Sequence, residues 1–173
     1  MNNFTIRKAQ PEDALGIATI HVKTWQCAYK GQIPDSYLDN LSIEKRRKTW
    51  NESLKKKEEV KHPIVAISEN KIVGWCASGK SRDEDVSDEI GELYGIYVSP
   101  EDIGQGVGSA LMKECLHNLK KDGYKKATLW VLDTNKKTKK FYEKKGWSLE
   151  GKTKNDVRDG FTLHEERYII TIN

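Results

Sequence analysis

The sequence lacks several features that would assign it to a particular class of protein. Its 173 residues include only three cysteines, Cys27, Cys76 and Cys115, which are far apart and odd in number. This predicts reduced thiols in a cytoplasmic protein rather than a disulfide framework. No apolar run approaches the ~18 residues of a membrane helix, and no basic segment precedes an apolar run near the amino terminus. We therefore expect neither a membrane span nor a secretory signal.

Histidine and net charge are also low. The four histidines show no HExxH or paired Cys/His spacing, so no metal site is expected. The net charge of +4 is too small to indicate nucleic-acid binding by itself. Basic residues gather between Lys113 and Lys145, where eleven lysines outnumber four acids. This stretch lacks the exposed stacking aromatics of a nucleic-acid module, so nucleic acid is not the partner we expect.

Aromatic residues give the chain large groups to bury. The chain has five Trp, seven Tyr and three Phe, spread along a sequence that is 36% hydrophobic and 32% charged. At roughly 150 residues per domain, this length predicts a single folded domain, residues 1–173, with a very polar surface.

Apolar periodicity predicts the elements of the first half. Period-two alternation indicates a strand over 4–9, and Pro11 opens a helix that carries Trp25 on its apolar face. The segment 29–35 ends this helix, and a second, more polar helix is expected from Ser42 to Lys57. A β-hairpin follows, with strands at 64–68 and 72–78. The acidic segment 82–89 is expected to be a solvated, mobile loop.

The second half alternates strands and helices. We expect a strand at 92–98, a helix at 106–122, a strand at 126–132 parallel to its predecessor, a short Lys-rich helix at 136–145, and two final strands around 158–160. The order βααβββαβαββ predicts an α/β (α+β) fold with a mixed, mostly antiparallel sheet.

Two glycine motifs call for opposite interpretations. The segment 146–153, GWSLEGKT, matches the phosphate-loop pattern, but it leaves a helix and enters a strand, so we reject it. The segment 103–112, IGQGVGSALM, follows a strand and opens an amphipathic helix. Its glycines permit a tight turn, and the amides at the helix start form a nest for an anion such as a pyrophosphate.

With these motifs in this order, the sequence resembles the GNAT superfamily of N-acetyltransferases. Their signature Q/R-x-x-G-x-G/A corresponds to 103–108, with Ile103 departing at the first position, and the strand 92–98 and the segment 135–147 also match in order. The resemblance implies helices on both faces of a sheet that is splayed between its fourth and fifth strands. It also implies acetyl-CoA as co-substrate, and binding of this coenzyme by Ile96, Tyr97, Val98, Ile103, Gly104, Gln105, Gly106, Val107, Gly108, Ser109, Asn135 and Lys144.

Acetyl transfer from a thioester to an amine requires a neutral amine and a proton for the departing thiolate. A lysine-like amine is neutral in only about one molecule in a thousand at neutral pH, so a base matters. Glu92 is our candidate base, with Asp133 a weaker competitor, and an ordinary strand-end acid is the alternative interpretation. Tyr142 is the candidate acid, at the family's tyrosine position, and Phe141 is the better candidate for core packing.

Three further contacts are suggested. Asn135 is expected to bind the pantetheine arm or to cap its helix. Lys139, Lys140 and Lys144 are candidates for the adenosine 3′-phosphate, although such a helix face is usually just solvated. The segment 24–38 resembles a subset of this family, and that resemblance implies that Trp25 and Tyr29 line the acceptor pocket. Packing of both side chains on the sheet is an equally good interpretation.

The expected function is therefore transfer of an acetyl group to a primary amine of a small molecule, polyamine-like or other, or of a peptide. The acidic segment weakly favours a polyamine. The alternatives are a non-catalytic acyl-CoA-binding sensor or regulatory module and, in third place, a basic nucleic-acid-binding domain. The sequence leaves a homodimer open and does not identify the acceptor.

Overall fold

The computed structural model describes residues 4–56, 63–158 and 160–172. The elements appear in the expected order with one additional short helix, α2. Their bounds are β1 Thr5–Lys8, α1 Ala14–Ala28, α2 Asp35–Asp39, α3 Ile43–Lys55, β2 Ile64–Ser68, β3 Lys71–Lys80, β4 Ile90–Val98, α4 Val107–Lys121, β5 Lys126–Leu132, α5 Lys136–Lys144, β6 Ser148–Arg158 and β7 Phe161–Thr171. Single-turn 3-10 helices at Pro11–Asp13 and Pro100–Asp102 precede α1 and α4.

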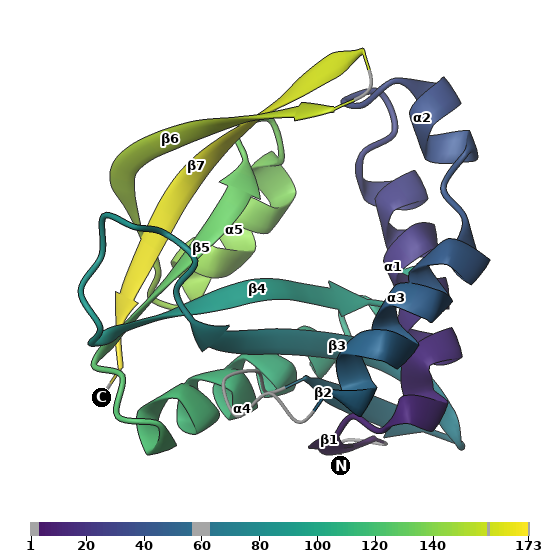
Figure 1. Cartoon of the computed structure of the whole chain (residues 1–173), viewed down its shortest axis with the longest axis horizontal. Helices are drawn as coiled ribbons and strands as arrows, with labels where there is room; N and C mark the ends of the chain where they lie inside the picture. Colours follow the sequence, from purple (N-terminus) through teal and green to yellow (C-terminus); the bar gives the residue numbers. More distant parts are fainter. Residues whose placement is uncertain (1–3, 57–62, 159, 173) are drawn as a thin grey trace.

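The described strands form one sheet in the order β1-β2-β3-β4-β5-β7-β6 (Figure 1). Neighbouring strands are antiparallel except β4 and β5, which are parallel and are connected through the crossover helix α4. The prediction of a mixed, mostly antiparallel sheet is therefore confirmed.

The sheet splays between β4 and β5. These strands pair only where Ile90–Glu92 faces Lys126–Thr128. Beyond that point β4 continues alongside β3, while β5 stays paired with β7 as far as Leu132. The expected splay is thus present, and it leaves backbone edges of both strands without a strand partner.

Helices cover both faces of the sheet, as expected (Figure 1). One core cluster joins Leu111 and Leu119 of α4 to Leu93 of β4 and Leu129 of β5. A second joins Ile17 of α1 to Val65, Trp75 and Ala77 of β2 and β3. A third cluster packs α2 and the end of α1 against β5 and β7. Helices therefore pack on both faces of the sheet, including the region where β4 and β5 separate.

Local chemistry explains the element boundaries. Ser42 caps α3, since its hydroxyl accepts from the Lys45 amide at 3.2 Å, and Asn135 caps α5 by accepting from the Thr138 amide at 3.2 Å. The hairpin turn between β2 and β3 places Glu69 at φ 49° and Asn70 at φ 61°, a geometry that asparagine tolerates well.

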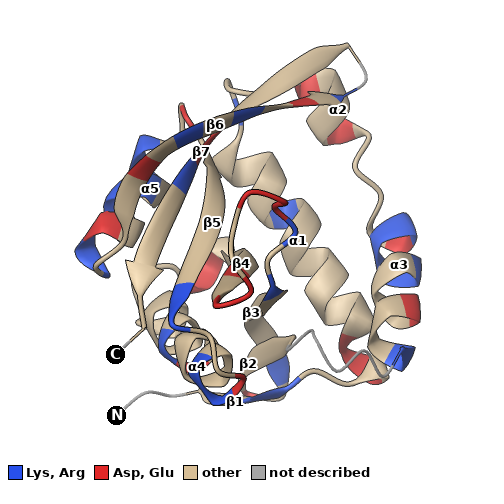
Figure 2. Ribbon diagram, turned by 60° about the vertical axis from the view of Figure 1, so that its left-hand side comes forward, with Lys and Arg blue, Asp and Glu red and all other residues tan. Residues whose placement is uncertain are grey.

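Two sequence expectations need correction. The segment after α1 does not simply end the helix, because Pro34 is followed by the short helix α2, where Leu38 is buried. The acidic segment 82–89, whose Asp and Glu residues are red between β3 and β4 in Figure 2, is not merely solvated, because Asp83 and Asp85 bind Arg167 of β7. Lys57, the expected end of the second helix, and Asp159 in the last turn lie outside the described residues. No helix in the described part of the chain is long and apolar enough to cross a membrane.

Candidate active site

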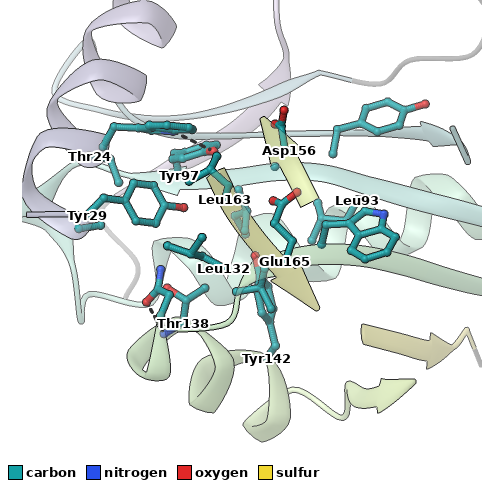
Figure 3. Close-up of a pocket in the computed structure, with 18 of the residues that line it drawn as sticks. Thr24, Tyr29, Leu93, Tyr97, Leu132, Thr138, Tyr142, Asp156, Leu163 and Glu165 are labelled. Carbon is teal, nitrogen blue, oxygen red and sulfur yellow. Dashed lines mark hydrogen bonds between the residues drawn. The ribbon is translucent and has the colours of Figure 1, made fainter. Parts of the chain in front are cut away.

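Two connected hollows lie where β4 and β5 separate. The first, which we call the glycine-loop groove, has a volume of about 720 Å³ and runs along the end of β4 and the start of α4. The second, the splay cavity, has a volume of about 250 Å³ and lies between α1, β4, β5, β6 and β7 (Figure 3). Both hollows are lined by Thr24, Ala28, Ile96, Tyr97, Asn135 and Thr138. The groove and the cavity therefore adjoin each other at these residues.

The glycine loop has the backbone geometry that an anion nest requires. Gly104 and Gly106 have φ of 90° and 87°, in the left-handed region, and a Cβ at either position would meet nothing within 4 Å. These residues are glycine because of their backbone conformation rather than crowding. Gly106 caps α4, whose first-turn amides have no intrahelical acceptor, and Gly106, Gly108 and Ser109 line the groove.

Most of the predicted coenzyme residues line the groove. These are Ile96, Tyr97, Val98, Ile103, Gly104, Gly106, Gly108, Ser109 and Asn135. Three do not: Gln105 donates to the Glu101 carbonyl, the Val107 side chain is buried in the core, and Lys144 lies at the far end of α5.

The groove lysines also differ from the expected ones. The lysines that line it are Lys136 and Lys137, in the first turn of α5. Lys139, expected at the 3′-phosphate, instead forms an ion pair with Glu166 of β7. The basic helix was found from sequence, but which of its lysines face the groove depends on how α5 rotates onto the sheet.

Asn135 and Thr24 connect the groove to the cavity. Asn135 is 7% exposed and caps α5, which is one of its two expected roles. The Thr24 hydroxyl donates to the Val98 carbonyl at 3.2 Å. The Thr24 contact holds α1 to the end of β4 at the splay.

Aromatic side chains form one wall of the cavity. Trp25 donates through Nε1 to the Tyr97 hydroxyl at 3.2 Å, and its ring meets that of Tyr29 edge-on at 4.9 Å. Both Trp25 and Tyr29 line the cavity and also pack against a core cluster, so their packing role is present and their contact with an acceptor stays a prediction. Burial raises the pKa of Tyr97 and of Tyr29, and the nearby Glu165 carboxylate adds to both shifts.

Tyr142 of α5 lines the cavity from the opposite side (Figure 3). It is 6% exposed and belongs to the main core cluster, and burial raises the pKa of its hydroxyl well above the ordinary value. Phe141 is only partly buried and lines the glycine-loop groove next to Gly108. The expectation that Phe141 is the better core residue of this pair is therefore wrong.

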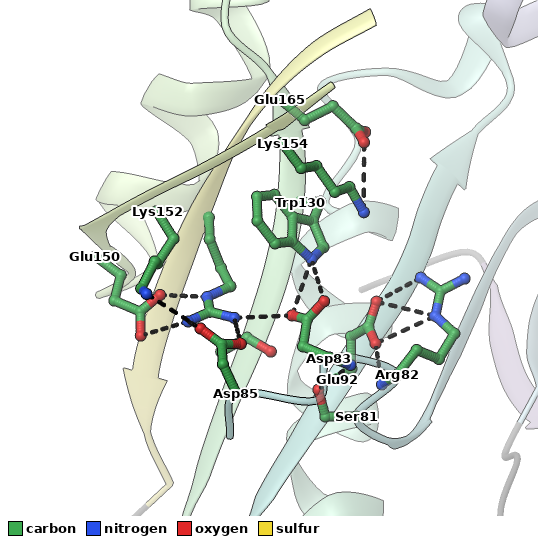
Figure 4. A network of polar contacts seen from close by, with 12 residues as sticks. Ser81, Arg82, Asp83, Asp85, Glu92, Trp130, Glu150, Lys152, Lys154 and Glu165 are labelled. Atoms are coloured by element: carbon green, nitrogen blue, oxygen red, sulfur yellow. Dashed lines mark hydrogen bonds and ion pairs between the residues drawn. The ribbon is translucent and has the colours of Figure 1, made fainter. Parts of the chain in front are cut away.

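Glu92 lines the same cavity, but both oxygens of its carboxylate already accept hydrogen bonds from Arg82 (Figure 4). It is 1% exposed. Its Oε2 accepts from the Arg82 backbone amide at 2.8 Å and from Nε at 3.2 Å, while Oε1 accepts from Nε at 3.1 Å and from Nη2. The Arg82 guanidinium also lies over the Tyr94 ring, 4.6 Å from its centroid. Proton transfer to Glu92 therefore competes with a bidentate ion pair.

The opposite wall carries residues that the sequence interpretation missed. Trp130 of β5 donates to both oxygens of Asp83 at 3.2 and 3.0 Å, and the Lys154 ammonium lies 4.3 Å from the centre of its ring. The same ammonium lies 3.5 Å from Glu165 of β7 (Figure 4). Period-two alternation along the last two strands was the available signal, since it places Lys154 and Glu165 on one face.

A buried arginine fixes this wall. Arg167 is 2% exposed and binds Asp83 at 3.1 Å, Asp85 at 2.6 Å and Glu150. The Arg167 guanidinium lowers the pKa of Asp85 to about 2. The acidic segment is thus held against β6 and β7, and it holds the Trp130 ring in place. No cluster of metal-ligating side chains occurs among the residues that the structure describes.

Comparisons with known proteins fit this geometry. The model of the acetyltransferase (GNAT) family matches residues 19–147. The uncharacterized N-acetyltransferase YuaI of Bacillus subtilis is 33% identical over 132 residues, 76% of this chain and 73% of that protein. The spermidine N(1)-acetyltransferase of Thermoplasma acidophilum is 23% identical over 151 residues, 86% and 90% of the two chains.

Solved structures show the same fold. A crystal structure of PaiA N-acetyltransferase from Thermoplasma acidophilum in complex with coenzyme A has a TM-score of 0.73 and 22% identity, and covers 94% of this chain and 97% of that one. A GCN5-related N-acetyltransferase from Rhodopseudomonas palustris has a TM-score of 0.77 and 17% identity, with 99% and 97% covered.

Proposed function

The chain belongs to the acetyltransferase (GNAT) family, and from that premise we propose that it transfers an acetyl group from acetyl-CoA to a primary amine by direct attack in a ternary complex. The observation that carries this proposal is the junction of the two hollows. One hollow is lined by the glycine loop and by basic residues, the other is lined by ionisable groups and aromatic side chains, and the two hollows share six lining residues.

The glycine-loop groove is the proposed coenzyme site. The α4 first-turn amides would hold the pyrophosphate, since unpaired amides and the helix dipole favour an anion there. Lys136 and Lys137 add positive charge at the rim. The unpaired edge of β4 over Ile96–Val98 and the Asn135 side chain would orient the pantetheine arm toward the cavity. When bound, the coenzyme supplies the activated acetyl group.

Tyr142 is the proposed acid. Its hydroxyl stays protonated at neutral pH because burial raises its pKa, which suits a group that gives its proton to a strongly basic leaving thiolate. Its place on the cavity wall supports this role.

Glu92 is the candidate base by position, since it lies in the cavity on the strand that precedes the glycine loop. The ion pair with Arg82 argues against it, because every contact of the carboxylate is already made. A Glu92→Gln variant decides between these two observations. If Glu92 is the base, the variant has a lower kcat and a different pH dependence of kcat. If Glu92 only holds Arg82, kcat and its pH dependence both stay as in the wild-type protein.

Trp25 and Tyr29 are proposed to contact the acceptor. Both lie on the cavity wall next to the junction with the groove. Their edge-on rings provide an apolar surface for the carbon chain of a small amine.

The test is thiol release from acetyl-CoA with a panel of amines, including spermidine, amino acids, aminoglycosides and a peptide amino terminus. Amine-dependent thiol release supports the proposal. Stabilisation by coenzyme without thiol release on any amine indicates a binding module instead, and no effect of coenzyme on thermal stability contradicts coenzyme binding altogether.

A further inference from the structure

The splay cavity contains a primary ammonium of the chain itself. The Lys154 side chain, 39% exposed, brings its ammonium to 3.5 Å from the Glu165 carboxylate and 4.3 Å from the centre of the Trp130 ring. A carboxylate together with an aromatic face is a typical binding arrangement for an alkyl ammonium. Lys154 thus shows which ligand chemistry these two side chains accept.

Glu165 is the carboxylate of the cavity whose partner is most easily replaced. Glu92 is held by the bidentate contact of Arg82, and Asp156 is paired with Arg158 at 2.5 Å. Among the residues that the structure describes, the ion-pair partner of Glu165 is the partly exposed Lys154, at the longer distance of 3.5 Å. Solvent-accessible pairs of this kind contribute little to stability. An incoming ammonium can therefore displace Lys154 at small cost.

The site is also rigid, which favours specific binding. Trp130 is fixed by its two hydrogen bonds to Asp83, and Asp83 is fixed by Arg167. Glu165 lies opposite Leu132 of β5 and opposite Lys154 of β6 in the strand pairing, so its backbone is held from both sides. Only Lys154 has to move.

An ammonium held in this way is not the one that reacts. A neighbouring carboxylate favours the charged form of an amine, whereas attack on the thioester needs the neutral form. The ligand that satisfies both conditions carries two amines, one charged and one free to lose its proton. We infer that Glu165 and Trp130 form a second-ammonium site, occupied by Lys154 when no acceptor is bound, and that the acceptor is a diamine or polyamine. This inference rests on the proposed function.

The experiment compares 1,4-diaminobutane and spermidine with butylamine as acceptors in thiol release. We expect the wild-type protein to have a kcat/KM for the diamine at least tenfold above that for butylamine. Glu165→Gln is expected to raise KM for the diamine at least tenfold while leaving butylamine nearly unchanged. Lys154→Met is expected to lower the same KM severalfold, because it removes the internal competitor.

The opposite directions of the two variants separate binding from folding. If the pair of Glu165 and Lys154 only stabilises the sheet, both variants change KM in the same direction or leave it unchanged, and the inference is overturned. The matched control is Glu166→Gln, on the other face of β7, which is expected to leave the preference for the diamine unchanged.

Different results would refute the second-ammonium site and the proposed function. A wild-type protein that acetylates butylamine as well as the diamine keeps the proposed function and refutes the second-ammonium site. A wild-type protein that releases no thiol with any amine refutes the proposed function.

Discussion

The protein should lose stability on mild acidification through one partly buried histidine, His21. His21 of α1 stacks on the Tyr97 ring with centroids 4.9 Å apart and lies 5.3 Å from the Trp75 ring centroid, and its Nδ1 is buried without a hydrogen-bond partner among the described residues. Burial and the nearby Arg46 lower its pKa from 6.5 to about 3. The folded protein therefore keeps this ring neutral where the unfolded chain protonates it.

The size of this stability loss follows from the difference between the His21 pKa in the folded protein and in the unfolded chain. Below pH 6.5 the unfolded chain binds a proton that the folded protein does not, so the free energy of unfolding falls as the pH falls, down to about pH 3. At about 1.4 kcal/mol per pH unit, the loss at pH 5 amounts to about 2 kcal/mol. The loss is absent at pH 8, where His21 is neutral in both states.

Urea denaturation of the wild-type protein and of His21→Phe, at pH 7 and at pH 5, measures this contribution. Phenylalanine retains an aromatic ring but does not titrate, so the variant should lose about 2 kcal/mol less than the wild-type protein between the two pH values. His117→Gln, at an exposed position of α4, serves as control and should keep the wild-type dependence. Equal pH dependence in the wild-type protein and His21→Phe would refute the claim that His21 is held neutral.

Three further substitutions test the site and its support. Tyr142→Phe should lower kcat for thiol release by about 10²-fold or more while coenzyme affinity by calorimetry stays the same, and full turnover would remove Tyr142 from the mechanism. Arg167→Met should lower the free energy of unfolding by about 3 kcal/mol, because Asp83 and Glu150 lose a buried partner; a change below 1 kcal/mol in urea denaturation would contradict that. Gly106→Ala should cost about 1 kcal/mol in the same assay because of its φ of 87°, and unchanged coenzyme affinity in this variant would argue against the amide nest.

Much of the fold could be predicted because its signals are local. The period of the apolar residues identified the main strands and helices, and β5 was predicted with the bounds that the structure gives. The short helix α2 was missed because its five residues are too few to show a period, and Leu38 is its only buried residue.

The site was predictable only in part. The glycine loop and Asn135 follow from backbone chemistry, which the sequence records directly. The pair of Glu92 with Arg82 and the group around Trp130, Lys154 and Glu165 depend on strand register and on where the acidic segment lies, and these are set by contacts between residues distant in the sequence. The side of α5 that faces the groove was undetermined for the same reason.

The central claim is that the glycine-loop groove and the splay cavity together transfer an acetyl group to an amine. Thiol release from acetyl-CoA by the wild-type protein, measured with and without 1,4-diaminobutane or spermidine and accompanied by mass spectrometry of the amine, tests it most directly. We expect thiol release that depends on the amine and saturates with its concentration, together with a monoacetylated product. Thermal stabilisation by coenzyme A with no thiol release on any amine would contradict it.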